Sequence, residues 1–444
     1  MVTVLHSAVF NICFLALAYF LYLKTRTFER VCAFGIVFFY TGYAFNFLVD
    51  DDYIDNSSLN YLIYNFGFFA NDSYYLQSFY LLSAFTVVVF VCLLLFPNLS
   101  SLKKFDNLNG YKPKRLLAFS FVSLILSFFI IHDYANIGQF YNFRYYEISR
   151  ASSGGLYNLH LILNQVGLFS MTVLLIIKFK NKTKTSYYFD FITYTILAQW
   201  TFFLILLGNR HELIVCLLFY FTYDLSLSKI KKSFLAYTLA AFFFLRVIEI
   251  CRGVEGYLYV DTLLNSFLNF SFFSVQSMIS GSEAFASHLS NYYVLKYGVI
   301  NENGVSLKWL LANFIPLIDL FDYSDTSYTL VYQSLNLPSN QGFTVHFVAG
   351  SFLNGGVLFV CLFMLLLMTA FYFLGLFFNH SHFAPQKKLL YIYFFAYYPF
   401  SIRSGPECFK ALFFEGLLIP LFILCTCYRG NRSLPINTFF DKVR

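Results

Sequence analysis

Charged residues and phosphate-binding loops are scarce in this chain. Only 12% of its 444 residues are Asp, Glu, Lys or Arg, whereas 59% are hydrophobic. No loop of the GxxxxGK[ST] type occurs, which argues against a nucleotide-driven pump. The nine cysteines fall mostly within apolar runs, so they predict neither a disulfide framework nor a metal centre. Internal repeats and low-complexity tracts are also missing.

Long apolar runs take the place of these features, and they predict an all-α, polytopic membrane protein. A helix needs about 20 apolar residues to cross a bilayer. Runs of this kind recur to the C-terminus and predict about eleven spans, within a range of ten to twelve, in a single membrane domain of residues 1–444. The first run lacks a basic region before it, which indicates a retained helix rather than a cleaved signal. The predicted spans are 4–23, 31–48, 74–96, 116–132, 156–177, 187–207, 213–228, 234–250, 347–378, 389–402 and 411–428.

The distribution of lysine and arginine predicts which side each loop faces. One alternating set of loops holds 21 of the 30 basic residues, and by the positive-inside rule this set is cytoplasmic. The N-terminus then lies outside. The predicted cytoplasmic loops are 24–30, 97–115, 178–186, 229–233, 379–388 and 429–444, and the external ones are 49–73, 133–155, 208–212, 251–346 and 403–410. The long external loop region, 251–346, offers the most room for a functional site.

Arginine dominates the basic residues of the external side, whereas lysine dominates inside. Arginine stays charged when partly desolvated and binds phosphate or carboxylate through two parallel hydrogen bonds. An arginine-rich external face at a bilayer surface therefore suggests a substrate that bears phosphate. The external arginines are Arg144, Arg150, Arg210, Arg246, Arg252 and Arg403.

Three ionisable residues stand together in the segment LILLGNRHELIVCLL, residues 204–218. The short link between two spans places Arg210, His211 and Glu212 at or just below the outer membrane face. A charge costs about 2.5–3.5 kcal/mol at the centre of a bilayer and less near its surface, so some interaction should compensate for it. One interpretation is an ion pair of Arg210 with Glu212 or Glu249 that only marks the turn. The other is a ligand-binding arginine.

Two further external segments combine arginine with turn-forming residues. FYNFRYYEISRASSGG, residues 140–155, places Arg144 and Arg150 among tyrosines before two glycines, which suits either a loop that closes over a ligand or an interfacial Tyr and Arg belt. RSGPECFK, residues 403–410, begins with Arg403 at the end of a span, and Glu407 is close enough in sequence to be its partner.

Two residues of the long loop region are candidates for a general base. His346 lies at the outer start of a predicted span, and a neutral imidazole can accept a proton from a hydroxyl near neutral pH. A histidine in that position is also often structural. Glu283, in SGSEAFASHL, is the alternative carboxylate for the same role.

These segments, in this order, resemble the Wzy-type O-antigen polymerases, a family of oligosaccharide repeat unit polymerases. GNRHELI is similar to the family's Gly-x-Arg-x-x-(Leu/Ile) element at the head of a helix. GSEAF and FIP are similar to a Glu and an Ile-Pro of the long loop. HFVAGSFLNGG resembles the Gly-rich helix start, and RSGPECF resembles the Arg-(Glu/Asp/Ser)-Gly element after the next-to-last span. Ser351 departs from the pattern, because it stands where many members carry Glu, and a catalytic role is not transferred to it.

The resemblance implies a fold, a reaction and a location. It implies a GT-C-like bundle in the bacterial inner membrane whose active side is periplasmic. The enzyme would transfer a growing glycan from undecaprenyl diphosphate to the nonreducing end of a new lipid-linked unit. No cofactor, metal or nucleic acid is implied. Membrane lipid, a chain-length regulator and a flippase are the implied partners.

The resemblance also suggests a role for each candidate residue. Arg210 and Arg403 would bind the leaving diphosphate, and Arg144 or Arg150 the second diphosphate. Arg252 is a further substrate-binding candidate. His346 or Glu283 would be the base, and Glu407 or Glu212 would orient an arginine. The residues that carry the resemblance lie in short stretches between 140 and 410.

Two other functions would use a similar chain. An O-antigen ligase has the same topology but transfers polymer to lipid A core, and these residues do not separate it firmly from a polymerase. A flippase should carry charges through the depth of several spans, whereas here they gather at one face.

Overall fold

The computed structural model describes about half of the chain. It describes residues 72–95, 110–135, 155–181, 186–207, 211–227, 258–273, 283–302, 327–334, 345–380, 389–394 and 412–428. Shorter stretches or single residues are described between 9 and 23, at 108, between 243 and 254, at 304 and 305, and at 396, 397, 402, 405 and 406. All structural statements below refer to these residues.

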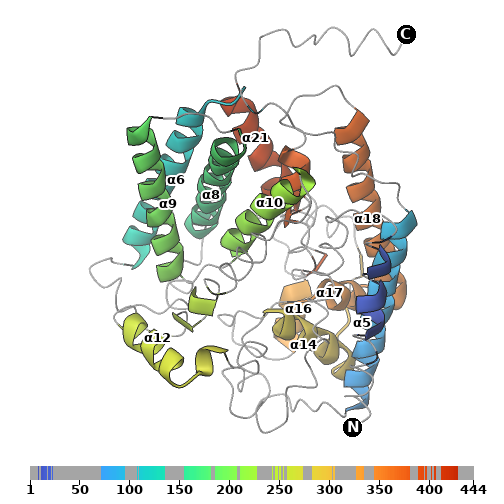
Figure 1. Ribbon diagram of the computed structural model, residues 1–444. Helices are drawn as coiled ribbons and strands as arrows, with labels where there is room; N and C mark the ends of the chain where they lie inside the picture. The colour runs from blue at the N-terminus through green and yellow to red at the C-terminus, as the bar shows by residue number, and fades with distance from the viewer. Residues whose placement is uncertain are drawn as a thin grey trace, which may run out of the picture.

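The described residues are mostly helical (Figure 1). They contain no β-strand, only an isolated bridge between Tyr111 and Tyr428. This arrangement confirms the all-α fold class. The helices are α5 (Ser73–Leu95), α6 (Pro113–Ala135), α8 (Gly155–Asn181), α9 (Tyr187–Leu207), α10 (His211–Leu227), α12 (Tyr259–Leu268), η4 (Ser271–Phe273), α14 (Glu283–Lys296), α16 (Ser327–Ser334), α17 (Phe347–Leu353), α18 (Gly356–His380), η6 (Phe414–Leu418) and α21 (Ile419–Cys427).

Three helices are long and apolar enough to cross a membrane. They cover Ser73–Leu95, Pro113–Ile131 and Leu159–Phe179, and each matches a predicted span. Shorter apolar helices run over Ile12–Leu21, Gly356–Thr369 and Phe414–Cys427. The protein is therefore a candidate membrane protein, and the total of eleven spans stays a prediction.

One group of helices has α8 at its centre (Figure 1). Helices α6, α10 and α21 contact α8, and α9 contacts α6. Trp200 of α9 is buried, and its indole N–H donates to Ser120 Oγ of α6 at 2.9 Å. Gly167 of α8 leaves the space that the Trp200 ring occupies, because a Cβ there would overlap the ring. Small residues at such crossings are typical of membrane helices, since they let two backbones approach closely.

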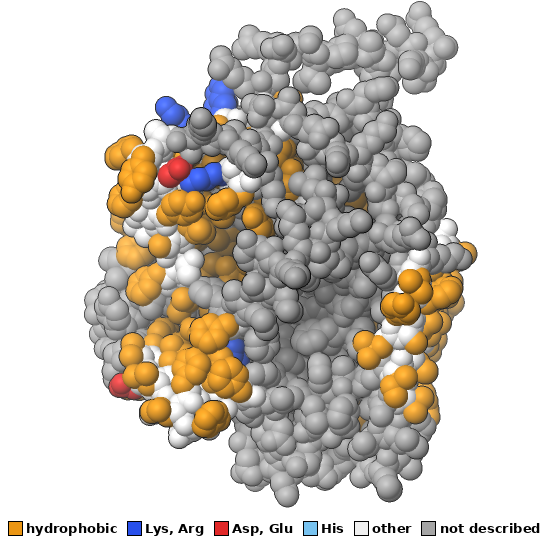
Figure 2. Space-filling view, in the orientation of Figure 1, with side chains coloured by type: hydrophobic (Ala, Val, Ile, Leu, Met, Phe, Trp, Pro, Cys, Tyr) orange, Lys and Arg blue, Asp and Glu red, His pale blue; other side chains and the backbone are white. Residues whose placement is uncertain are grey.

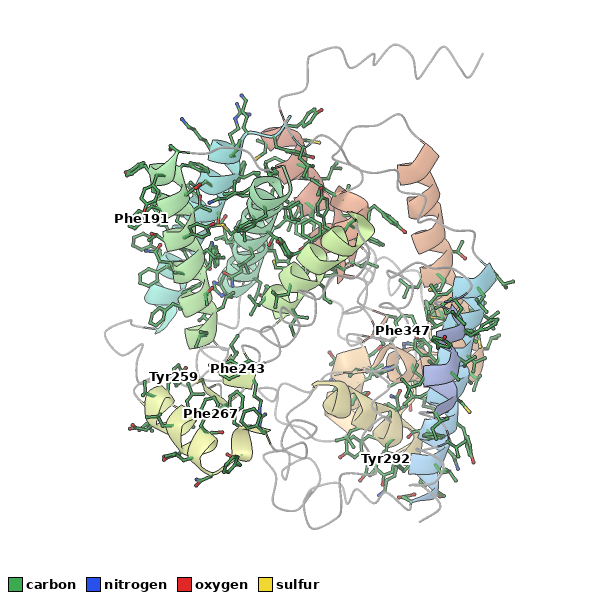
Figure 3. The ribbon with its side chains drawn as sticks, viewed as in Figure 1. Phe191, Phe243, Tyr259, Phe267, Tyr292 and Phe347 are labelled. Atoms are coloured by element: carbon green, nitrogen blue, oxygen red, sulfur yellow. The ribbon has the colours of Figure 1, made fainter. Side chains whose placement is uncertain are left out.

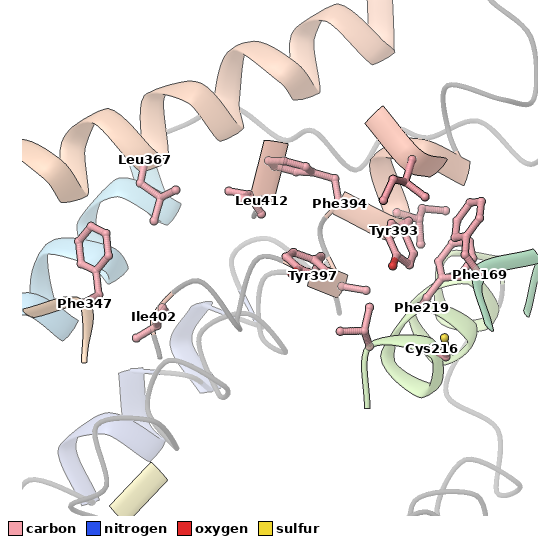
Figure 4. Close-up of a cluster of buried hydrophobic side chains, with 14 of the residues drawn as sticks. Phe169, Cys216, Phe219, Phe347, Leu367, Tyr393, Phe394, Tyr397, Ile402 and Leu412 are labelled. Atoms are coloured by element: carbon pink, nitrogen blue, oxygen red, sulfur yellow. The ribbon is translucent and has the colours of Figure 1, made fainter. Parts of the chain in front are cut away.

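Buried aromatic rings extend this core toward residues 389–397 (Figure 4). Phe169 of α8 stacks on Phe219 of α10 with ring centroids 5.6 Å apart. Tyr393 meets both rings edge to face, at 4.6 Å from Phe169 and 5.2 Å from Phe219. Edge-to-face pairs are favourable because the positive edge of one ring meets the negative face of the other. These contacts attach residues 389–397 to the α8 group.

A second group contains α5, α14, α16, α17 and α18. The start of α5 is joined to the end of α14 by Asp72, Tyr292 and Lys296. The Tyr292 hydroxyl donates to Asp72 Oδ2 at 2.8 Å, and Lys296 Nζ donates to the Tyr292 hydroxyl at 2.6 Å. Burial alone would raise the pKa of Asp72, but the hydrogen bonds from Tyr74 and Tyr292 and the charge of Lys296 hold that pKa below its ordinary value. This cluster anchors a helix of the long loop region on a membrane-crossing helix.

The described residues between 243 and 273, which cover the end of the predicted span 234–250 and the start of the long loop region, form a small apolar unit. The rings of Phe243, Phe267 and Phe272 lie against one another, with 4.3 Å between the centroids of the last two (Figure 3). Helix α12 buries none of its residues fully, and its apolar side chains appear on the surface beside η4 (Figure 2). Arg246 is buried, and its guanidinium donates to the backbone carbonyls of Ser271 and Phe272. Arg246 therefore supports η4 within the protein, which is a structural use of one external arginine.

The predicted span 347–378 is wrong as a single helix. The structure divides it into α17 and α18, and Gly356 at the junction has a left-handed φ of +68°. Asn354 ends α17, where its side-chain amide donates to the Gly350 carbonyl at 2.7 Å and its Oδ1 accepts from Asn301 Nδ2 at 2.6 Å. The break arises because glycine adopts positive φ at little cost and because Asn301 holds the end of α17.

The last predicted span, 411–428, contains a widened turn. Residues Phe414–Leu418 form a π-helix, and Pro420 lies in the first turn of α21 that follows. Proline has no backbone N–H, and its ring would clash with the carbonyl four residues earlier, so a regular helix is unfavourable at this point. Single π-turns of this kind are frequent at functional sites.

A candidate site around helix α17

Two of the nine predicted site residues have described side chains, namely His346 and Glu212. Glu283 begins α14, but its side chain lies outside the described residues. The remaining predictions also fall outside them, so the structure leaves those assignments untested. They are Arg144, Arg150, Arg210, Arg252, Arg403 and Glu407.

Helix α14 brings the Glu283 segment to the start of α17. The backbone N–H of His346 donates to Ser290 Oγ of α14 at 2.9 Å, and both residues are buried. Glu283 is the first residue of α14 and precedes Ser290 by seven residues, about 10 Å along the helix axis. The two base candidates from the long loop region therefore belong to elements in direct contact.

Ile402, Gly405 and Pro406, which flank Arg403 in sequence, also pack against α17. The backbone N–H of Phe347 donates to the Ile402 carbonyl at 2.6 Å (Figure 4). Gly350 faces Gly405 and Pro406, which belong to the RSGPECFK segment. Three segments that were singled out separately in the sequence thus meet around α17.

Gly350 packs tightly against Gly405 and Pro406, so a larger side chain at this position should destabilise the protein. A Cβ at this position would lie 2.6 Å from Pro406 Cδ and 3.2 Å from Gly405 Cα. Neither a proline ring nor a backbone atom can move aside cheaply. Gly350→Ala should therefore destabilise the protein by about 1–3 kcal/mol, as overpacking does elsewhere. Thermal unfolding in detergent measures the loss, with Val357→Ala on the exposed side of α18 as the control.

His346 is the N-cap of α17 and has no exposed surface. Its Nδ1 accepts a hydrogen bond from the Val348 N–H at 3.0 Å, and Phe85 meets its ring edge to face. Because Nδ1 is an acceptor, the neutral ring carries its proton on Nε2. Nε2 has no hydrogen-bond partner among the described residues. Burial lowers the pKa of His346 to about 3.

This geometry favours a structural role for His346 over the role of a base. The one lone pair of the neutral ring is already used by Val348, and protonation would replace that acceptor with a donor in a buried place. A substrate hydroxyl would meet the Nε2–H, which can donate a hydrogen bond but cannot accept a proton. His346 is therefore the weaker candidate for the base, and Glu283 remains as the other candidate.

Substitutions of His346 distinguish a cap from a base. Asn is a favourable N-cap residue, so His346→Asn should keep the helix start and most of the activity, whereas His346→Ala should lower the stability by about 1 kcal/mol. Thermal unfolding measures the change in stability, and an assay of the purified protein measures the change in activity. A His346→Asn protein that folds with wild-type stability but is inactive would restore His346 as a catalytic candidate.

A network of buried polar groups supports the far end of α17. Ser327 Oγ of α16 donates to the Gly350 carbonyl at 3.3 Å, and the Asn301 N–H donates to the Leu353 carbonyl at 2.7 Å. Ser351 stands where the resembling family often has Glu, and its hydroxyl is buried with no partner in the described part of the chain. The structure therefore places Ser351 inside the protein, and its position supports packing rather than catalysis.

Glu212 lies in the first turn of α10 and is buried, near a second carboxylate that the sequence analysis did not single out. Tyr393 interacts electrostatically with both Glu415 and Glu212. Glu415 belongs to the π-helix, and its Oε2 accepts hydrogen bonds from Gln165 Nε2 of α8 and from the Tyr397 hydroxyl. In the sequence, Glu415 could have been recognised as a candidate because it is an acidic residue inside the apolar run 411–428.

One surface groove lies apart from these residues. It runs along α9 and is lined by Tyr187, Asp190, Phe191 and Tyr194, with none of the predicted site residues among its lining. Asp190 forms an ion pair with Lys178 at 2.8 Å, and Lys178 lies over the Tyr194 ring at 4.1 Å. Among the described residues, no group of three metal-ligating side chains occurs.

Comparisons of the chain with protein-family models, with curated proteins and with solved structures give no match. The functional argument therefore depends on the residues and their arrangement.

Proposed function

We propose that the protein polymerises lipid-linked oligosaccharide repeat units at the periplasmic face of the bacterial inner membrane. The substrates are two glycans on undecaprenyl diphosphate. The nonreducing-end hydroxyl of one unit attacks the anomeric carbon of the growing chain, a new glycosidic bond forms, and the bond to the diphosphate breaks. Undecaprenyl diphosphate leaves with the electron pair, and the proton of the hydroxyl passes to a base.

The candidate residues divide this reaction among them. Negative charge develops on the diphosphate as it leaves, and fixed arginines stabilise such charge more strongly at a water-poor site than in bulk water. Arg210 and Arg403 take this role, and Arg144 or Arg150 binds the second diphosphate. Glu283 accepts the proton, while Glu212 and Glu407 orient arginine side chains.

The observation that best supports this proposal is the convergence on α17. The hydrogen bonds His346 N–H to Ser290 Oγ and Phe347 N–H to the Ile402 carbonyl connect the helix that starts at Glu283 with the residue before Arg403. A carboxylate and an arginine on two segments that both contact the start of α17 are the minimum that base-assisted displacement of a diphosphate needs.

Deletion of the gene, followed by gel analysis of the surface polysaccharide, tests the proposal. A polymerase deletion should abolish the ladder of chain lengths and leave a single repeat unit on the lipid A core. Loss of every unit from the core would instead indicate the ligase or the flippase. Complementation with the wild-type chain is the control, and it should restore the ladder.

A further inference from the structure

Glu415 has one carboxylate oxygen that accepts two hydrogen bonds from the protein and another that has no partner among the described residues. Gln165 Nε2 and the Tyr397 hydroxyl both donate to Oε2. No partner for the other oxygen occurs in the described part of the chain, and the residue is partly exposed. The carboxylate is therefore held in a set orientation while one of its oxygens can accept hydrogen bonds from another molecule.

The amide of Gln165 leaves a second acceptor at the same place. Gln165 is only 5% exposed, and its Oε1 has no hydrogen-bond partner among the described residues. A buried polar atom without a partner costs about 1–3 kcal/mol, so it usually marks a position where another group binds. Because Oε1 belongs to the same amide that donates to Glu415, the two unsatisfied acceptors are neighbours.

The local sequence positions these groups at a helix irregularity. Glu415 lies within the π-helix Phe414–Leu418, where the wider turn changes the direction of the side chain. Gly416 packs beside Tyr397, since a Cβ there would lie 3.3 Å from the Tyr397 ring. A larger residue at position 416 would separate the Tyr397 hydroxyl from the carboxylate.

The same chain segment connects this site to the α17 region (Figure 4). Tyr397 contacts Glu415, and Ile402 accepts from Phe347 at the start of α17. Arg403 follows Tyr397 by six residues, a length of chain that spans at most about 20 Å. Glu415 is also the fifth residue of the predicted span 411–428, so it lies about 6 Å from the predicted outer end of that span.

We propose that Glu415 and Gln165 form a subsite that binds hydroxyl groups of the glycan substrate. Both free atoms are acceptors, so the ligand must supply hydrogen-bond donors. Sugar hydroxyls are donors that a carboxylate and a neighbouring amide oxygen can bind together, as charge-assisted bonds. Tyr397 is a positioning residue, because it acts through the carboxylate. This inference rests on the proposed function and adds a place where the substrate is recognised.

The experiment compares wild-type and Glu415→Gln proteins, purified in detergent, in polymerisation of the lipid-linked unit extracted from the deletion strain. Glu415→Gln preserves the shape but turns half of the acceptor group into a donor. Loss of a charge-assisted hydrogen bond should raise the KM for this unit by about 10- to 100-fold, with kcat within about twofold. Thr195→Val is the matched control, since it removes a side-chain hydrogen bond on the exposed side of α9.

Several outcomes would overturn the subsite. An unchanged KM with a lower unfolding temperature would mean that the cluster only holds helices together. A wild-type KM that depends on sodium or potassium concentration, with that dependence lost in Glu415→Gln, would assign the acceptors to a cation. If Glu415→Gln does not fold, Gln165→Leu takes its place, and an unchanged KM there is equally decisive. A wild-type protein that makes no polymer refutes the proposed function itself.

Discussion

Replacement of Arg210 by alanine should reduce the rate of polymerisation by about 100- to 1,000-fold, as loss of one fixed donor to a developing charge does in other enzymes. Arg210 is proposed to bind the leaving diphosphate through two parallel hydrogen bonds. Lysine keeps the charge but cannot form that pair, so Arg210→Lys should restore only short polymer. Polymer length in the complemented deletion strain and initial rates of the purified protein measure both effects.

Arg115→Lys provides the matched control for this substitution. Arg115 lies near the start of α6, and its Nη1 donates to the Thr426 carbonyl at 2.7 Å at an exposed position. It lies in the predicted cytoplasmic loop 97–115, far in topology from the proposed reaction. Full-length polymer from Arg210→Lys would rule out bidentate recognition at Arg210. Full-length polymer from Arg210→Ala would remove the residue from the mechanism.

Glu283→Gln should lower kcat by about 100- to 10,000-fold, because positioned general bases typically contribute that much. The prediction follows from His346, whose single lone pair already accepts from the Val348 N–H. Glu283 is the first residue of α14, the helix that contacts the His346 backbone through Ser290. Initial rates with the purified lipid-linked unit measure the loss.

A pH profile adds a second readout for Glu283. A carboxylate base acts in its ionised form, so the wild-type rate should fall toward acidic pH. The Glu283→Gln protein should lack that acidic limb. Glu302→Gln, an exposed glutamate of the same loop region, should leave both the rate and the profile unchanged. A Glu283→Gln rate within twofold of wild type would exclude it as the base.

The sequence predicted the helical class and several helix limits well because both depend on local properties. The predicted spans 74–96, 116–132 and 156–177 differ by only a few residues from the starts and ends of α5, α6 and α8. Apolar length sets such limits, since a helix that crosses a bilayer must satisfy its own backbone and cover about 30 Å.

The α17–α18 junction could not be predicted in this way. The apolar residues continue across it, so hydropathy reads one span over 347–378. The break depends on the hydrogen bond from Asn301, which is 53 residues away in sequence from Asn354. Helix α14 within the long loop region also escaped prediction, since it is held by contacts with α5 and α17.

Charge patterns predicted which ionisable residues are external but could not assign their partners. Arg246 belongs to the external arginines in sequence, yet in the structure it donates to backbone carbonyls of Ser271 and Phe272. Residue type and side of the membrane are the same for a ligand-binding and a structural arginine, and only the neighbouring atoms distinguish them.

By itself, the sequence determined the helical class and the long apolar runs, and it predicted the bias of arginine toward one side and the residue types that suit the proposed chemistry. These properties follow from composition and spacing, which act over a turn or a span. The tertiary structure decided that α14 and Ile402 both contact the start of α17, that the His346 lone pair is occupied, and that Glu415 faces Gln165 and Tyr397. Hydrogen bonds between residues up to 250 positions apart set these features, and no local pattern encodes such pairings.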